Sequence, residues 1–112
     1  MSLLGIVERA QRVNVSLAGS SSDALAANIS PLQGAATFRV TVSIQSGTTF
    51  GVFLTAGGFT RYMPLNAGTA FVADALYSFV FGVRPGYSYN FRAGGATTIN
   101  YLLVEEVTSA VI

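Results

Sequence analysis

The stretch from Tyr77 to Gly95, YSFVFGVRPGYSYNFRAGG, alternates aromatic residues with small or polar ones on both sides of Pro85-Gly86. Alternation with a period of two is typical of a β-strand whose two faces meet different surroundings. Proline followed by glycine suits the central positions of a type II turn. The stretch therefore predicts two strands joined by a tight turn, with their rings packed in a core between two sheets.

The same alternation recurs along most of the chain. Its strongest instance is residues 36–45, where apolar residues occupy one parity and polar residues the other. Pro64 indicates that the strand over 59–65 is an edge strand or ends there, and a break near Asp74 divides the strand over 71–83 in one interpretation. The further expected strands, separated by turn residues, span 12–17, 50–54, 59–65, 71–83, 87–92 and 97–108.

The last of these strands carries apolar residues on both parities. We expect Ile99, Tyr101 and Leu103 on one face and Leu102 and Val104 on the other. A strand that is apolar on both faces is central in its sheet or lies in an interface.

Seven or eight short strands with a turn about every ten residues predict an all-β fold. An antiparallel β-sandwich, a jelly roll or a small barrel fits this pattern, in a single domain over residues 1–112. Residues 1–10 fit either a short helix or an extended N-terminal arm, and residues 109–112 are expected to form a C-terminal tail. Residues 23–27 fit either one helical turn or irregular backbone.

The side chains that most often perform catalysis are missing, since the chain has no histidine, cysteine or lysine. Glu105 and Glu106 are neighbours in a strand, so they should point to opposite faces and not form a carboxylate pair. Asp74 is expected to be half-buried and held by an arginine or by backbone hydrogen bonds, with a calcium ligand or an acid as the alternative. We therefore predict no enzyme activity, no cofactor and no metal.

Charged residues make up only 10% of the chain, against about 25% in typical domains. A lone soluble protein usually covers itself with charged side chains, so we expect other protein to cover part of this surface. All six basic residues are arginine, a residue suited to interfaces, although a codon bias explains this equally well. The net charge of +1 and the scattered arginines argue against nucleic-acid binding.

The first residues are not expected to form a signal peptide, because they lack a basic segment and Glu8 interrupts the apolar run. No stretch reaches the roughly 18 apolar residues of a membrane-spanning helix, so no membrane partner is expected.

Both ends of the chain are apolar, and each is expected either to dock onto a neighbouring subunit or to fold back on its own sandwich. If they dock, the nearby arginines and glutamates could pair across subunits and set the register. The predicted contact residues are Leu3, Leu4, Ile6, Val7, Arg9, Arg12, Leu102, Val104, Glu105, Glu106, Val111 and Ile112.

The strand-and-turn style of residues 36–107, together with the low charge and apolar ends, resembles small structural proteins of virions. The likeness is to the head decoration (cement) proteins of tailed bacteriophages and similar viral jelly rolls. It implies a virion protein, assembled in the host cytoplasm, that forms a homo-oligomer, with a trimer favoured. Its further partner would be the major capsid protein or another virion protein, and it would bury apolar surface between capsid subunits.

Two other functions remain open. A carbohydrate- or receptor-binding module of a tail or fibre would need an aromatic rim with polar neighbours. Its candidate residues are Tyr62, Asp74, Tyr87, Tyr89 and Asn90. A head–tail joining or tail-tube subunit would need a ring and a long protruding hairpin, and no predicted loop is long enough for such a hairpin.

Overall fold

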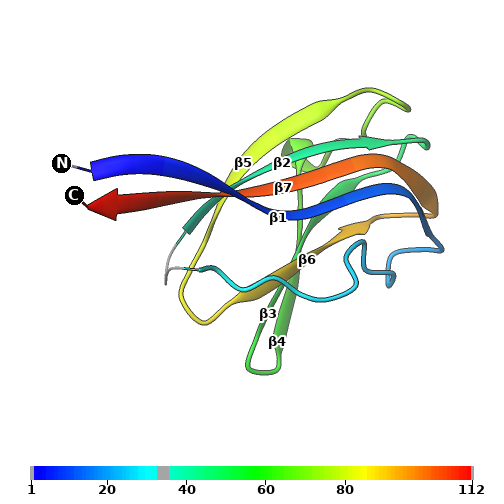
Figure 1. Cartoon of the computed structure of the whole chain (residues 1–112). Helices are drawn as coiled ribbons and strands as arrows, with labels where there is room; N and C mark the ends of the chain where they lie inside the picture. The colour runs from blue at the N-terminus through cyan, green and yellow to red at the C-terminus, as the bar shows by residue number, and fades with distance from the viewer. Residues whose placement is uncertain (1, 33–35, 112) are drawn as a thin grey trace.

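In the computed structural model the chain forms two antiparallel β-sheets that pack as a sandwich (Figure 1), so the predicted all-β sandwich is confirmed. The structure describes the backbone of residues 2–32 and 36–111 and the side chains of residues 5–32 and 36–107. The first sheet, in spatial order, consists of β1 (Ser2–Leu17), β7 (Thr97–Val111), β2 (Ala36–Ile44) and β5 (Tyr77–Val83). The second consists of β4 (Phe59–Pro64), β3 (Phe50–Ala56) and β6 (Ser88–Ala93).

Aromatic rings from both sheets fill the space between them. Tyr89 of β6 meets Phe38 of β2 edge-on, with 4.6 Å between ring centroids, and Phe91 stacks on Phe50 at 5.8 Å. Phe81 of β5 contacts both Tyr89 and Phe91. Such pairs contribute about 0.5–1.5 kcal/mol beyond the burial of their area. The predicted packing of the rings of β5 and β6 between two sheets is therefore confirmed.

β7 lies between β1 and β2, which confirms its predicted central position. Its side-chain alternation is broken because Asn100 is an extra residue relative to β2. Ile99 before this bulge and Leu102 after it are both fully buried, although they differ in parity. The expectation that Ile99 shares a face with Tyr101 and Leu103 is therefore wrong.

The N-terminal segment is an extended strand and not a helix. β1 pairs with β7 along its whole length, from Ser2 opposite Val111 to Leu17 opposite Thr97. The pairing of β7 with β2 stops at Val107. Residues 2–5 and 108–111 thus form a two-stranded ribbon, here called the arm, which projects from the sandwich with both ends of the chain at its tip (Figure 1).

The arm changes the expectation for the C-terminal end. Residues 109–111 continue β7 as paired strand and do not form a tail, because β1 supplies their hydrogen-bonding partner. Ile112 lies outside the described residues.

The loop over residues 70–76 differs from the predicted pattern, whereas residues 23–27 follow one of the two predicted alternatives. Residues 70–76 form no strand, since the chain turns at Asp74, whose φ is 62°, and β5 begins only at Tyr77. Residues 23–27 are irregular and run along the edge of β6, where the N–H of Ala24 donates to the carbonyl of Phe91 at 2.8 Å. A further bridge joins Ile29 to β6, so this segment covers an edge that would otherwise be open to another strand.

β4 forms an edge of the second sheet and ends at Pro64, as the proline predicted. No helix in the described part of the chain is long and apolar enough to cross a membrane.

Candidate functional site

Within residues 2–32 and 36–111, no three acidic, histidine or cysteine side chains come together in a way that could hold a metal ion. Six of the charged side chains instead lie in three separate ion pairs. The arrangement is therefore best described as a set of surfaces and buried polar contacts, each built by particular strands.

Glu105 and Glu106 point to opposite faces of β7, which confirms the prediction from their adjacency. On the outer face, Glu105 Oε1 accepts hydrogen bonds from Arg39 Nε at 2.9 Å and Nη2 at 2.7 Å. Arg39 lies directly opposite Glu105 on β2, so the sheet register creates this pair.

On the inner face, Glu106 is fully buried and forms an ion pair with Arg9. Its Oε2 also accepts the backbone N–H of Leu32 at 3.0 Å. Arg9 can reach Glu106 because it is the extra residue of a bulge in β1, between Glu8 and Ala10. The pair thus ties β1, β7 and the loop before β2 together where the arm leaves the sandwich.

These contacts show where the predicted inter-subunit charges lie. Arg9, Glu105 and Glu106 all have ionic partners inside their own chain, because neighbouring strands bring the opposite charges together. Arg12 is partly buried on β1 and forms no ion pair with a described residue.

Tyr89 belongs to the same interior and not to a ligand rim, because its side chain is fully buried. Its hydroxyl has no hydrogen-bond partner among the described residues. Burial raises the pKa of this hydroxyl far above its ordinary value; Arg9 opposes the rise and Glu106 adds to it.

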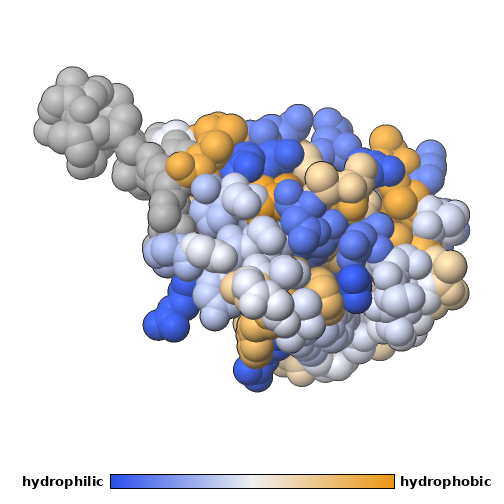
Figure 2. All heavy atoms as spheres, turned by 90° about the horizontal axis from the view of Figure 1, so that it is seen from below, coloured by the Kyte–Doolittle hydropathy of each residue, from blue (hydrophilic) through white to orange (hydrophobic). Residues whose placement is uncertain are grey.

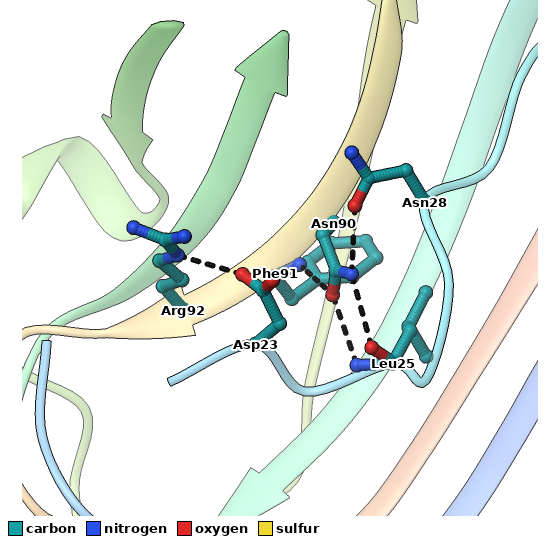
Figure 3. Close-up of polar contacts among 6 residues, drawn as sticks. All are labelled: Asp23, Leu25, Asn28, Asn90, Phe91 and Arg92. Atoms are coloured by element: carbon teal, nitrogen blue, oxygen red, sulfur yellow. Dashed lines mark hydrogen bonds and ion pairs between the residues drawn. The ribbon is translucent and has the colours of Figure 1, made fainter. Parts of the chain in front are cut away.

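Asn90 is buried beside Tyr89 and has a structural task (Figure 3). Its Oδ1 accepts the N–H of Leu25 at 2.9 Å, and its Nδ2 donates to the Leu25 carbonyl at 3.1 Å and to Asn28 Oδ1 at 3.0 Å. The side chain thus replaces a backbone partner for the irregular segment beside β6. The expected exposed rim loses Tyr89 and Asn90, since Tyr89 lies among the core rings and Asn90 is buried against Leu25 and Asn28.

The other expected rim residues lie apart. Tyr62 lines a hollow beside Arg92, whose guanidinium stacks 3.6 Å above the Phe53 ring, whereas Tyr87 lines a different groove. Asp74 is exposed and accepts a hydrogen bond from Asn100 Nδ2 at 2.9 Å. The expectation of a half-buried Asp74 is wrong, because it sits at a turn and not inside a strand.

The predicted apolar contact residues of β1 and β7 also lie in different places. Leu102 and Val104 are fully buried in the chain's own core and are therefore not at the surface. Leu3, Leu4 and Val111 lie in the paired strands of the arm, and their side chains are outside the described part.

Large hydrophobic side chains do remain exposed, in small groups. At the base of the arm, Ile6 is 58% and Val7 38% exposed. Figure 2 shows one face of the molecule, on which hydrophobic residues alternate with polar ones and do not merge into one patch. Across residues 5–32 and 36–107 the exposed set is Ile6, Val7, Val13, Leu32, Phe59, Met63, Val72, Leu76 and Val80.

One of these groups lines a groove of about 270 Å³ between β4, β3 and the end of β5. Phe59, Arg61 and Met63 of β4 form one wall, and Arg84 lies in the turn after β5 on the other. Sequence reasoning missed this groove. The available signal was the shared parity of Phe59, Arg61 and Met63, which places two apolar side chains and an arginine on one face of an edge strand.

Comparison with protein-family models and with curated proteins finds no match for this chain.

Proposed function

We propose that this protein is a structural subunit of a virion, most simply a capsid decoration (cement) protein. It would form a homo-oligomer, with a trimer favoured, and cover the joints between major capsid protein subunits. The observation that carries the proposal is the arm, which leaves the sandwich with Ile6 and Val7 exposed at its base.

The physical reason is that the chain has little charge with which to solvate such an element. Charged residues make up 10% of the sequence, and six of them are already used in three internal ion pairs. Burying apolar surface stabilises an assembly by about 25 cal/mol per Å² before ordering costs. A projecting ribbon offers such area to a neighbour on both of its faces.

A head–tail joining or tail-tube subunit is the second candidate, and the arm favours it as well. Such a subunit needs a protruding two-stranded element. Here the paired ends of β1 and β7 would supply it in place of a loop. A carbohydrate-binding module has less support, because two of the five proposed rim residues are buried.

Sedimentation velocity over a range of protein concentrations tests the proposal. We expect an oligomer that weakens when Val111 and Ile112 are deleted, while the circular dichroism of the sandwich is retained. A monomer at every concentration that also fails to cosediment with empty capsids would contradict the assembly role.

A further inference from the structure

We infer that the base of the arm and the β4–β5 groove are the two halves of one contact between copies of this chain. The strip formed by Ile6 and Glu8, which share one face of β1, would lie in the groove of the next copy. The inference rests on the proposed function and specifies which surfaces build the homo-oligomer.

The strip carries a negative charge that its own chain does not neutralise. Glu8 lies directly opposite Glu105 in the register of β1 and β7, and like charges in this position destabilise a sheet. Arg39 directs two of its N–H groups to Glu105. Glu8 itself forms no ion pair with any described residue. Arg39 thus neutralises Glu105 and leaves the charge of Glu8 without an ionic partner, which a guanidinium from another molecule would supply.

The groove carries the opposite imbalance. Arg61 and Arg84 line the same groove, and neither has an ionic partner in the described part of the chain. The three remaining arginines with known partners, Arg9, Arg39 and Arg92, are all neutralised internally. Two unneutralised cations therefore flank an apolar floor.

The apolar parts match in the same way as the charges. Phe59 is 51% and Met63 46% exposed in the groove, and Ile6 is 58% exposed on the strip. An apolar strip ending in a carboxylate is thus complementary to an apolar groove flanked by guanidiniums.

The topology makes a second copy the occupant. β1 and β5 are opposite edges of the same four-stranded sheet, so the strip and the groove lie on opposite sides of one molecule. The contact would join different surfaces of the two copies. Contacts of this head-to-tail kind close into rings or continue as filaments.

Charge reversal tests the polar half of the contact by sedimentation velocity. We expect Glu8→Arg alone, or Arg61→Glu with Arg84→Glu, to weaken self-association roughly tenfold or more. Combining the three reversals in one chain should restore the wild-type size, because each reversed surface then meets its complement on the next copy. Ser16→Arg, which adds a charge at an exposed position near the other end of β1, is the matched control and should retain the wild-type size.

One-sided apolar variants test the direction of the contact. Ile6→Asp removes the strip and Met63→Asp removes the groove, so each variant alone should be a monomer. Their mixture retains one working strip and one working groove and should stop at a one-to-one dimer. Val72→Asp, at an equally exposed position elsewhere, should leave assembly unchanged. Circular dichroism confirms that each variant is folded.

The outcomes separate this inference from the proposed function. The head-to-tail contact would be wrong if none of these variants weakens the wild-type oligomer. It would also be wrong if the Met63→Asp variant dimerises by itself, without the Ile6→Asp variant present. Either result would leave the homo-oligomer intact. A wild-type monomer would overturn this contact and the homo-oligomer, and the proposed assembly role would fall as well if that monomer does not cosediment with empty capsids.

Discussion

Glu105 and Glu106 are adjacent in β7, each paired with an arginine, yet they occupy opposite physical environments. The outer pair is open to water, with the Arg39 side chain 45% and the Glu105 side chain 16% exposed. The inner pair is largely dry, with the Arg9 side chain 18% and the Glu106 side chain 0% exposed. Water screens the first pair, whereas removing a partner from the second leaves a charge without solvent. The same chemistry one residue apart therefore predicts very different energetic consequences.

The largest effect is expected for Glu106→Ala. This substitution leaves Arg9 without its ionic partner and the N–H of Leu32 without an acceptor. We expect the free energy of unfolding to fall by about 3–5 kcal/mol, measured by urea denaturation. Glu106→Gln retains an acceptor for Leu32 and should cost less. A loss below about 1 kcal/mol for Glu106→Ala would mean that the inner pair behaves like the outer one.

Asn90→Ala extends the comparison to a buried side chain without charge. It removes the acceptor and the donor that hold Leu25 and leaves both backbone groups of that residue unpaired. We expect a loss of about 2–4 kcal/mol, since each orphaned buried group costs about 1–3 kcal/mol. Hydrogen exchange should also accelerate at residues 24–29. Unchanged exchange there would show that other contacts hold the segment.

Tyr89→Phe examines a buried polar atom that has no partner. Its hydroxyl makes no hydrogen bond with the described residues, so its removal should stabilise the protein by about 1 kcal/mol near neutral pH. Tyr89 can be compared with Glu106 because both side chains are fully buried, but only the polar atoms of Glu106 have hydrogen-bond partners among the described residues.

The pH dependence of this residue has a definite sign. Burial raises the pKa of Tyr89 above that of an unfolded tyrosine, which is about 10. Below this pH both states keep the proton, and above it only the folded state does, so stability falls as pH rises. We expect Tyr89→Phe to gain an advantage over wild type of about 1.4 kcal/mol per pH unit above pH 10. If the free energies of unfolding of the two proteins differ by the same amount at every pH between 8 and about 11, this expectation is wrong.

The smallest effect is expected for Glu105→Ala, which opens the outer pair. The loss should be about 1 kcal/mol or less, and added salt should diminish it further. A double-mutant cycle with Arg39→Ala isolates the pair. A coupling energy of several kcal/mol between Arg39 and Glu105 would show that the outer face of the first sheet is covered in solution. We expect that result only if assembly buries this face.

Prediction from the sequence succeeded where a side chain's role depends on its immediate neighbours. The alternation around Tyr77–Val83 and Ser88–Ala93, the turn at Pro85-Gly86 and the opposite faces of Glu105 and Glu106 are local properties of a strand, and all appear in the structure. The candidate site was predicted less well. Ile6 and Val7 were predicted contact residues and are indeed exposed, at the base of the arm. The groove beside β4 and the burial of Asn90 were not predicted.

By itself the sequence determined that this protein is made of β-strands that alternate apolar and polar side chains, because period-two patterning and turn residues act within a few residues. Only the tertiary structure decided which charges meet, since Arg9 and Glu106 are 97 positions apart and touch through a bulge that patterning does not reveal. It also decided that the two ends run together as an arm, because strand pairing across the whole chain sets where β2 stops and β1 and β7 continue.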